Sequence, residues 1–514
     1  MSIRVKSVFL FAAVLGFLAL TVPANHSEAE DAYYYSLMAE QGAWSEMFHA
    51  HHLFYLPLMR IIFRAVQFAG YAGRPLPVLT AVSMISGALA VCLMASLLRR
   101  AGAKARTARF FSAALLFSYG FWRYSTTAEI YVPAAALVLL TIYCAVRSED
   151  HPLFFGGSVL SGVSALLMHL VTLPAILLAV PLFYFAKQCR RRAILYFTLT
   201  VLIASSVYFS AARTAGLTVF TDKQIVRESL FSSRVWLKGA AASGQNVLSG
   251  NFLFAFPSAA KKIESMFPLQ MLQEEVFMGQ KAPVWVRRMA PVTLGLTAAL
   301  FAALLFIMVR KIHWTAMIGL ALLWLGGTAG MALCFEPANP EMWVSALAPF
   351  WLMAGSLWDA APSGGRLSRR LPAMLAIALL VHNWTGGMSL IKTPESDYCR
   401  QKGAWVIEHA RHGDLILTAD SHSFVTFLEY QTPARVLDAK FRTPENIIQI
   451  LESRGSGRVF VYSDVINVLP AVASRGPGKV ARLQTLAGQL HSKLTPVFDA
   501  GNWVVYEWDH PRDK

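Results

Sequence analysis

Two neighbouring acids and three consecutive tyrosines follow closely on an apolar run near the start of the chain. The run VFLFAAVLGFLAL is succeeded by SEAEDAYYYSLMAE (residues 27–40), which contains Glu30, Asp31 and Tyr33 to Tyr35. A carboxylate placed beside a hydroxyl can take up its proton, and a carboxylate can also hold a metal ion. This pattern makes Asp31 our first candidate for a general base and Glu30 the second.

A structural interpretation competes with the catalytic one at this segment. Ser27 and Glu30 have the S-x-x-E spacing of a capping box, in which Glu30 would only begin a helix. The tyrosines could belong to the aromatic belt that membrane proteins place at the membrane–water interface. Asp31 therefore ranks before Glu30.

Three further polar candidates lie beside later apolar runs. Glu129 and Tyr131 belong to FWRYSTTAEIY, where Thr126 and Glu129 again have capping-box spacing. Glu129 can therefore cap a helix, contact a ligand, or do both. His169 lies at the end of an apolar run, where it is either a buried side chain that reaches toward the interface or a phosphate contact.

The acid Glu341 lies in the segment ANPEMW, which has the pattern of a helix start. Asn339 could cap the helix, and Pro340 could occupy its first position. Glu341 would then favour the helix N-terminus electrostatically, which is the alternative to a role in a binding site.

Most of the cations that could hold a phosphate lie in a long loop at about 212–290. Arg234 and Lys238, in SSRVWLKGAAASG, are our first choices, with Arg213 and Arg123 behind them. An arginine can bind two phosphate oxygens at once, whereas a lysine acts as a point charge. We expect this loop to supply at least one phosphate contact.

The sequence does not decide whether the protein binds a metal ion. The run HAHH brings His49 and His51 together, yet the sequence supplies no certain third ligand. The five cysteines are scattered without a CxxC pair, so neither a zinc site nor a disulfide framework is indicated. Cofactors are left unassigned, with a divalent metal as one option.

The composition identifies the setting of these residues. Of the 514 residues, 55% are hydrophobic and only 15% are charged, against about 25% charged residues in a soluble domain. The deficit is concentrated in long apolar runs, which indicates a polytopic membrane protein. Much of the net charge of +16 lies in short clusters between these runs. No basic helix or aromatic pattern accompanies it, so nucleic acid is not an expected partner.

Apolar runs predict the membrane spans. A helix needs roughly 20 mostly apolar residues to cross a bilayer. We predict about eleven spans, near residues 7–23, 76–98, 108–122, 131–147, 153–168, 172–187, 193–211, 291–309, 314–333, 344–359 and 372–390. Lys and Arg concentrate in alternate short loops, which places the N-terminus inside and the C-terminal part outside. The first run could instead be a cleaved signal peptide, and Asp31 would be outside either way.

The segment at about 52–70, HLFYLPLMRIIFRAVQFAG, is apolar enough to be mistaken for a span. Arg60, Arg64 and Gln67 fall on one face of a helix. Each arginine at mid-membrane would cost about 2.5–3.5 kcal/mol. We predict an amphipathic helix that lies on the outer leaflet.

The composition changes from about Thr393. GDLILTAD (413–420), ARVLDA (434–439), GRVFVYSD (457–464) and NWVVYEWD (502–509) have the pattern of strands, with helical stretches such as PENIIQILESR between them. We predict an extracytoplasmic α/β domain over 391–514, after a transmembrane domain over 1–390. It lacks a Gly-rich phosphate fingerprint, so a nucleotide cofactor is not supported.

The chain resembles the GT-C superfamily of integral-membrane glycosyltransferases. The resemblance rests on EDAYYYSLMAEQG after the first span, on HHLFYLPLMRIIFRA, and on YSTTAEIYVPAAALVLL at the start of a later span. It covers roughly residues 1–390 and is closer to the protein-mannosyltransferase-like and lipid-A-aminosugar-transferase-like branches. Such enzymes use a polyprenyl-phosphate-linked sugar as donor, carry an acidic motif in the first outer loop, and often end in a soluble domain.

The resemblance implies a glycosyltransferase of the bacterial plasma (inner) membrane that acts at its outer face. The acceptor would be a lipid, a glycan or a protein, and the sugar would be displaced directly with inversion. Asp31 and Glu30 would be the catalytic acids. The residues expected to contact donor or acceptor are Tyr34, Glu129, Tyr131, His169, Arg234, Lys238 and Glu341.

Three alternatives remain beside the transferase. A transporter or flippase of lipid-linked oligosaccharides would place ionisable residues near mid-membrane, but the expected spans are nearly free of them. An oligosaccharide ligase or polymerase would depend on the basic loop more than on Asp31. A scaffold would only bind a partner through its outer domain. The triplets NHS and NWT, at Asn25 and Asn383, match the N-glycosylation pattern, although such triplets arise readily by chance.

Overall fold

The computed structural model describes residues 3–26, 31–216, 232–267, 272–310, 313–360, 366–453, 457–474 and 477–509. Glu30, one of the two expected catalytic acids, lies outside these ranges. The chain forms two compact units. The helical unit comprises Met1–Pro23, Met38–Phe252 and Pro283–Lys392, and the α/β unit comprises Ala24–Leu37, Leu253–Ala282 and Thr393–Lys514. Two segments from earlier in the chain thus belong to the same unit as the C-terminal part.

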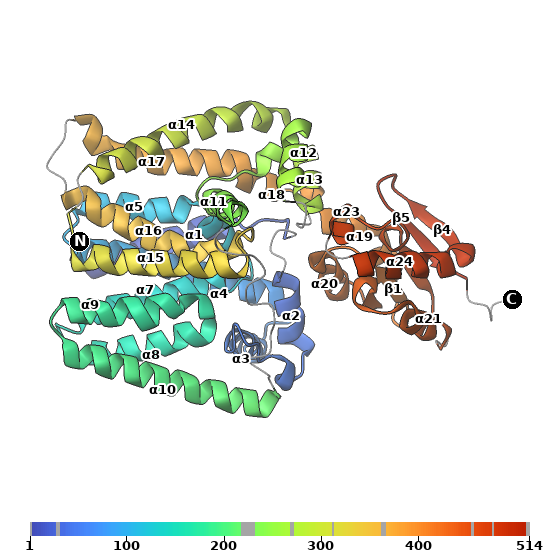
Figure 1. Cartoon of the computed structure of the whole chain (residues 1–514), viewed down its shortest axis with the longest axis horizontal. Helices are drawn as coiled ribbons and strands as arrows, with labels where there is room; N and C mark the ends of the chain where they lie inside the picture. Colours follow the sequence, from blue (N-terminus) through green and yellow to red (C-terminus); the bar gives the residue numbers. More distant parts are fainter. Residues whose placement is uncertain are drawn as a thin grey trace. The chain divides into compact units, whose positions relative to one another are not determined.

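The helical unit is built of helices that lie side by side (Figure 1). Helix α7 packs on α4 and α8, α15 on α16, and α14 on α17. The bounds are α1 (Ile3–Leu20), α3 (Tyr55–Phe68), α4 (Pro75–Arg100), α5 (Ala105–Phe117), α6 (Tyr119–Ser125), α7 (Tyr131–Arg147), α8 (Leu153–Met168), α9 (Val180–Ala186), α10 (Arg190–Ala215), α11 (Ser233–Val247), α14 (Val284–Val309), α15 (Ala316–Phe335), α16 (Glu341–Ala360), α17 (Arg366–Asn383) and α18 (Ser389–Ile391). Helix α2 (Ala32–Gln41) begins in the α/β unit and ends in the helical unit.

All eleven expected spans coincide with helical residues in the part of the chain that the structure describes. Five helices there are long and apolar enough to cross a membrane: Pro75–Arg100, Arg190–Ala215, Val284–Val309, Ala316–Phe335 and Arg370–Ile391. Only 22% of the most apolar stretch of α10 and of α14 is buried, and large apolar surfaces of this kind mark contact with a membrane or a partner. The fold is a polytopic helical membrane bundle with a small C-terminal α/β sheet, as predicted.

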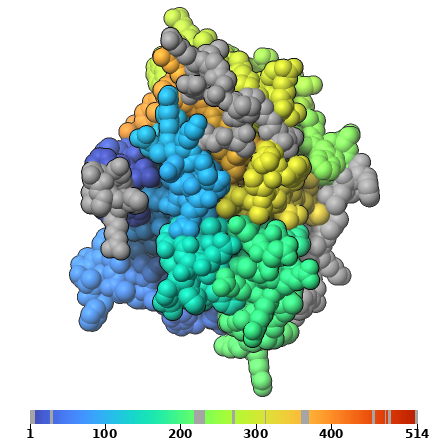
Figure 2. All heavy atoms as spheres, turned by 90° about the vertical axis from the view of Figure 1, so that its left-hand side faces the viewer, coloured from blue at the N-terminus to red at the C-terminus, as the bar shows by residue number. Residues whose placement is uncertain are grey.

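Charged segments between apolar helices gather at one end of the helical unit. Arg100, at the end of α4, binds Asp150 at 2.8 Å, and Lys187, after α9, lies 3.9 Å from Glu149. These contacts join three connections, and this end lies on the left of Figure 1 and toward the viewer in Figure 2. Basic loops at one shared end are what the positive-inside rule requires. Which side of the membrane they face stays a prediction.

Helix α3 is the amphipathic segment that the sequence analysis predicted, and it is too short to span a bilayer. Its buried face includes Leu56, Met59 and Phe63. Arg60 binds the backbone carbonyl of Gly42, and Arg64 donates to the carbonyl of Glu40 at 3.3 Å. The two arginines thus hold carbonyl groups at the end of α2, where cations are favoured. The position of α3 on the outer leaflet stays a prediction.

A buried asparagine joins three helices of the helical unit. The side-chain amide of Asn383 donates to the carbonyls of Phe117 at 2.7 Å and Val247 at 2.8 Å, and its oxygen accepts the N–H of Ser249 at 2.8 Å. Polar groups buried in apolar surroundings need such partners. Asn383 is fully buried, and Asn25 of the α/β unit is 1% exposed. Neither triplet that matches the N-glycosylation pattern therefore offers an accessible asparagine in the folded chain.

The α/β unit contains a five-stranded mixed sheet in the order β2-β1-β3-β5-β4. The first three strands are parallel, and β5 and β4 continue antiparallel. The bounds are β1 (Leu415–Thr418), β2 (Arg435–Asp438), β3 (Val459–Tyr462), β4 (Leu494–Asp499) and β5 (Val504–Trp508), with helices α12 (Pro257–Met266), α13 (Gln273–Gln280), α19 (Tyr398–His409), α20 (His422–Gln431), α21 (Pro444–Glu452), α22 (Ser463–Ile466), α23 (Pro470–Ser474) and α24 (Pro477–Leu490).

Each of the four predicted strand segments contains a strand, but the sequence analysis missed β4. This strand lies at the edge of the sheet, and its pairing with β5 shifts register between Pro496 and Phe498. Proline cannot donate to a ladder of hydrogen bonds and is tolerated at edges and bulges. Pro496 therefore interrupts the sequence pattern by which a strand is identified.

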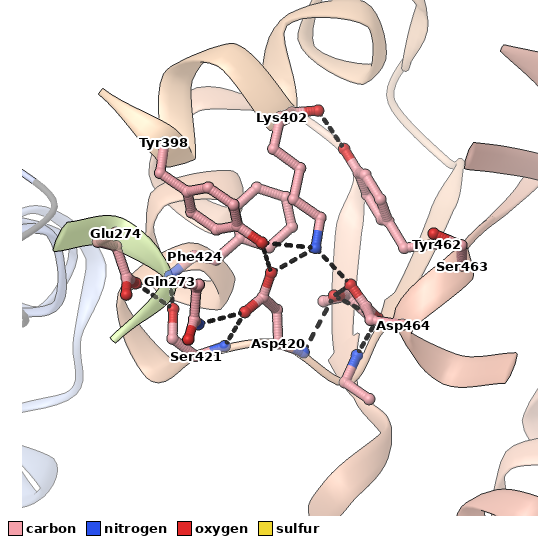
Figure 3. Close-up of polar contacts among 12 residues, drawn as sticks. Gln273, Glu274, Tyr398, Lys402, Asp420, Ser421, Phe424, Tyr462, Ser463 and Asp464 are labelled. Carbon is pink, nitrogen blue, oxygen red and sulfur yellow. Dashed lines mark hydrogen bonds and ion pairs between the residues drawn. The ribbon is translucent and has the colours of Figure 1, made fainter. Parts of the chain in front are cut away.

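A lysine lies between two aspartates that follow the carboxyl ends of β1 and β3 (Figure 3). The chain passes from β1 to β2 on one side and to β3 on the other, and open α/β sheets usually bind ligands at such a switch point. Here Lys402 of α19 binds the carboxylate of Asp420 and lies 2.6 Å from Asp464 Oδ2. Its ammonium also donates to the Tyr398 hydroxyl at 3.2 Å. All three ammonium protons thus have acceptors.

Backbone and loop groups hold the two carboxylates of this cluster. Asp464 accepts the N–H of Ala419 at 2.6 Å, and Asp420 accepts the N–H of Ser421 at 2.6 Å. The α13 segment also contacts this cluster, because Gln273 donates to Asp420 at 2.7 Å. Beside it, the Ser421 hydroxyl donates to the buried carboxylate of Glu274 at 2.7 Å. The protein's own side chains therefore occupy the place of a ligand.

Charge pairing outweighs burial in setting the pKa values of this cluster. Burial alone would raise the pKa of Asp420, but Lys402 and hydrogen bonds from Tyr398 and Ser421 hold it below its usual value. Burial alone would lower the pKa of Lys402, but the two carboxylates raise it. The cluster is therefore an ion pair at neutral pH.

Replacing Lys402 by methionine should destabilise the α/β unit. Lys402→Met leaves two buried carboxylates without their cation, and we expect a loss of about 3–5 kcal/mol in the free energy of unfolding. Hydrogen exchange of β1 and β3 peptides in the full-length protein under increasing urea measures this loss. Arg442→Met is the control, since Arg442 makes an exposed hydrogen bond to Asn446. A loss equal to that of the control would contradict the prediction.

The same unit should lose stability at both extremes of pH. Because the pKa of Asp420 is depressed on folding, its contribution is present above the ordinary value of 3.8 and is lost as the pH falls below it. Because the pKa of Lys402 is raised, its contribution is complete below 10.5 and is lost as the pH rises through the folded value. As the pH is lowered from about 7 to about 3, the midpoint temperature of thermal unfolding should fall less steeply in Asp420→Asn than in the wild type. Parallel curves would contradict this assignment.

Candidate functional site

A series of aromatic and imidazole rings crosses one end of the helical unit. Tyr124 of α6 lies 6.2 Å from Tyr131, the first residue of α7, and Tyr131 lies 5.1 Å from His169, which follows α8. The ring of His169 is 6.3 Å from His52, which stacks on His49 at 4.2 Å. Because α7 runs from here to the end with the basic loops, this series marks the opposite end of the unit.

A buried glutamate lies beside this series. Glu129 is fully buried, and its backbone exchanges hydrogen bonds with the Ser83 hydroxyl of α4 at 3.2 and 3.4 Å. Helix α7 begins after Ile130 without a side-chain cap, so Thr126 and Glu129 do not form the capping box that the spacing allowed. A buried carboxylate is costly and concentrates at functional sites. Glu129 therefore stays a binding-site candidate.

The histidines are held in defined positions. The Nδ1 atom of His169 accepts the N–H of Val171 at 2.9 Å, which places the proton of the neutral ring on Nε2. Burial lowers the pKa of His52 well below its ordinary value, and the nearby His49 and His169 lower it further. His52 is therefore neutral at physiological pH. Within the described ranges, no three His, Cys, Asp or Glu side chains are grouped to hold a metal ion.

Helix α11 carries the expected phosphate-binding cations. Arg234 is exposed and Lys238 is half-buried, while Val235 faces α15 and α16. Gly239 lets α11 come close to them, because a Cβ atom there would lie 2.6 Å from the side chain of Leu333. The close packing fixes the axis of α11, so Arg234 and Lys238 project from a rigid element.

Glu341 begins α16 and is 8% exposed. Its N–H donates to the Asn339 side chain at 3.0 Å, so Asn339 binds the first N–H of the helix, but Pro340 precedes the helix and does not occupy its first position as predicted. The carbonyl of Pro340 accepts the side-chain amide of Asn246, near the end of α11, at 2.7 Å. This hydrogen bond ties the start of α16 to the helix that carries Arg234 and Lys238.

Asp31 and Tyr34 lie in the α/β unit, unlike the other site residues. The half-buried Asp31 accepts a hydrogen bond from the Tyr35 hydroxyl at 2.8 Å through Oδ2. The ring of Tyr34 lies 6.0 Å from that of His422, the first residue of α20. The carboxylate is thus oriented by a neighbour one helical turn away.

The structure therefore divides the expected site between two units. Six residues belong to the helical unit, namely Glu129, Tyr131, His169, Arg234, Lys238 and Glu341, and Asp31 and Tyr34 belong to the α/β unit. The sequence analysis missed Tyr35 as the partner of Asp31, although its i, i+4 spacing was a signal. It also missed His52 as a neighbour of His169, because nothing local joins residues so far apart in sequence.

No protein-family model matches the chain, and no curated protein matches its sequence. Matches are found among solved structures. Two crystal structures of ArnT from Cupriavidus metallidurans, one bound to undecaprenyl phosphate and one in the apo state, each match with a TM-score of 0.61 at 12% identity. Each match covers 98% of this chain and 98% of ArnT. The arabinofuranosyltransferase AftD from mycobacteria matches at 15% identity over 99% of this chain and 40% of AftD, with a TM-score of 0.44 that does not define a fold.

The likeness to ArnT shows the fold. It extends over nearly the whole of both chains, so it includes the helical unit as well as the C-terminal sheet. The chain therefore has the fold of ArnT, in agreement with the helical membrane bundle and C-terminal sheet that the resemblance led us to expect. The likeness in fold does not by itself identify a substrate, because one fold can carry different chemistry.

Proposed function

We propose that the chain is a glycosyltransferase that moves a sugar from a polyprenyl-phosphate-linked donor to a lipid, glycan or protein acceptor. The observation that carries this proposal is the oriented carboxylate of Asp31 on a chain with the GT-C fold. The matching ArnT structure is bound to undecaprenyl phosphate, which supports a polyprenyl phosphate as the lipid part of the donor.

Asp31 is the general base of the proposed reaction. As the acceptor oxygen bonds to the anomeric carbon, Asp31 takes the hydroxyl proton. The bond between the anomeric carbon and the phosphate oxygen breaks, and the polyprenyl phosphate leaves with the bonding electrons. Attack from the face opposite the phosphate inverts the anomeric centre. Tyr34, half-buried one turn from the base, suits the apolar face of a sugar ring.

The departing phosphate needs cations. Arg234 and Lys238 meet this need on the rigid helix α11, where Arg234 can bind two phosphate oxygens and Lys238 adds a point charge. Glu129, Tyr131, His169 and Glu341 provide the remaining contacts to donor or acceptor. They are buried at the end of the helical unit away from the basic loops.

The proposed site faces the outside of the bacterial plasma membrane. The basic loops that gather at one end of the helical unit are retained in the cytoplasm under the positive-inside rule. The chain leaves the helical unit for the α/β unit at Pro23, Phe252 and Lys392, so we place the α/β unit on the extracytoplasmic side. The apolar surface of α10 and α14 then faces lipid, where the prenyl chain of the donor is also found.

Replacing Asp31 by asparagine should abolish transfer without weakening donor binding. Because an asparagine side chain keeps the shape of the aspartate but lacks its basic oxygen, turnover of the donor should fall by about 10²- to 10⁴-fold. The assay uses the full-length protein in lipid nanodiscs with a panel of radiolabelled polyprenyl-phosphate sugars and a membrane extract as acceptor source. Glu46→Gln is the control, since Glu46 is an exposed acid in the same part of the chain.

Two outcomes would contradict the proposal. Turnover that is unchanged in Asp31→Asn would remove Asp31 as the base. Movement of the intact donor across the bilayer without release of its sugar would favour the transporter or flippase instead.

The proposed role of Arg234 and Lys238 predicts how variants at these positions bind the polyprenyl phosphate. Arg234→Gln and Lys238→Gln should each weaken binding of the polyprenyl phosphate, by roughly 5- to 50-fold, because each loses a charge-assisted hydrogen bond. Equilibrium binding of the polyprenyl phosphate alone measures this loss, and Arg191→Gln, in the exposed basic first turn of α10, is the control. Equal affinities in all three variants would show that α11 does not hold the phosphate.

A further inference from the structure

The segment that carries Asp31 is part of the α/β unit and not a free connection between spans. Residues Ala24–Leu37 belong to this unit together with the C-terminal part from Thr393 to Lys514. A separation of 371 positions lies between Asn25 of the segment and its partner Ser396, so the association is entirely tertiary. The contacts that make it are specific and buried.

A tyrosine from the segment is inserted against α20. The ring of Tyr33 lies 5.2 Å from that of Phe427 in an edge-to-face arrangement and 5.6 Å from that of Tyr430. The three side chains are 3%, 3% and 4% exposed. Phe427 and Tyr430 are three residues apart, so they lie on one face of α20. Edge-to-face pairs of this kind prefer one orientation and therefore fix the ring that they hold.

A second tie holds the segment before Asp31. The side-chain amide of Asn25, which is 1% exposed, donates to the carbonyl of Ser396 at 2.9 Å. Asp31 is thus flanked in sequence by two residues, Asn25 and Tyr33, that are both bound to the C-terminal part of the chain. Both ends of the segment are fixed on the same unit.

Tyr35 orients the carboxylate of Asp31. Tyr35 is 2% exposed, and its hydroxyl donates to Asp31 Oδ2 at 2.8 Å. Its N–H donates to the carbonyl of Asp31 at 2.8 Å, which makes Asp31 the start of the first turn of α2. Tyr33 and Tyr35 therefore have different roles. The ring of Tyr33 packs on α20, and the hydroxyl of Tyr35 binds Asp31.

Helix α20 is itself held by the lysine cluster. Its first N–H groups are capped by Ser421, whose hydroxyl accepts the N–H of Phe424 at 3.2 Å. Ser421 follows Asp420 directly, and Asp420 is an ion-pair partner of Lys402. A continuous set of contacts therefore runs from the carboxyl ends of β1 and β3 through α20 to Tyr33, which lies two residues after Asp31.

We infer that the α/β unit positions the catalytic base. In this role α20 holds the first turn of α2 through Tyr33, and Tyr35 aims the carboxylate of Asp31. Tyr33, Tyr35, Phe427 and Tyr430 are positioning residues that touch no reacting atom. The inference rests on the proposed role of Asp31 as the base. It gives the C-terminal sheet a part in catalysis in place of the ligand that its switch point would otherwise bind.

Tyrosine variants of the full-length protein in nanodiscs test the inference. Tyr33→Ala should lower kcat roughly 10- to 100-fold, because small displacements of a catalytic group cost this much. Binding of polyprenyl phosphate should stay within about twofold, since the cations for it lie on α11. Tyr33→Phe retains the ring and should restore kcat. Phe441→Ala, which removes a 70% exposed ring elsewhere in the same unit, is the control.

A second variant distinguishes the orientation of the Asp31 carboxylate from the packing of its segment on α20. Tyr35→Phe removes only the hydroxyl that binds Asp31, so kcat should fall while the segment stays attached to α20. Hydrogen exchange distinguishes the two. Amides of residues 31–41 should exchange faster in Tyr33→Ala but not in Tyr35→Phe, and β1 and β3 should be protected equally in both. A purely structural role for Tyr33 would instead expose β1 and β3 as well.

The outcomes decide the inference separately from the proposed function. An unchanged kcat in Tyr33→Ala, or faster exchange throughout the sheet, would overturn it. If wild-type protein turned over no donor, the proposed function would fail, and the exchange measurement would still decide whether α20 holds the segment around Asp31. Faster exchange confined to residues 31–41 in Tyr33→Ala, reversed in Tyr33→Phe, would support attachment by α20. No change in exchange would overturn it.

Discussion

The α/β unit depends on one buried ammonium group. Lys402 lies between Asp420 and Asp464 at the carboxyl ends of two parallel strands, where an isolated charge of either sign would be costly. Because all three ammonium protons are engaged, the ions fix α19, β1 and β3 against one another. The same cluster sets the start of α20, and through α20 it reaches the segment that carries Asp31. Under the proposed function, catalytic geometry and stability thus share one electrostatic origin in this unit.

In the helical unit, the backbone groups at helix ends need hydrogen-bond partners within apolar surroundings. Asn383 meets the carbonyls of Phe117 and Val247, where α5 and α11 end, and so removes groups that would otherwise be unsatisfied. The end with Glu129 and His169 keeps its polar groups buried, while α10 and α14 present apolar side chains outward. Charged and polar groups gather at the two ends of the unit, because a bilayer excludes unpaired polar groups between them.

The base and the cations of the proposed reaction are each supported within their own unit. Transfer of a sugar needs a base for the acceptor and cations for the departing phosphate. Asp31 is held by aromatic packing and a hydrogen bond, whereas Arg234 and Lys238 project from a closely packed helix. A rigid support for each group reduces the reorganisation that the reaction would otherwise require.

The sequence by itself determined the helices, the amphipathic character of α3 and the alternation of strands and helices after Thr393, because apolar runs and their periods are local properties. It also ranked Asp31 first among the candidate acids, and this ranking stays a prediction. Only the tertiary structure decided that Tyr33 packs on Phe427, that Lys402 lies at the switch point, and that Ala24–Leu37 belongs with the C-terminal sheet. These contacts join residues far apart in the chain, and no local pattern encodes them, since they depend on how whole surfaces fit together.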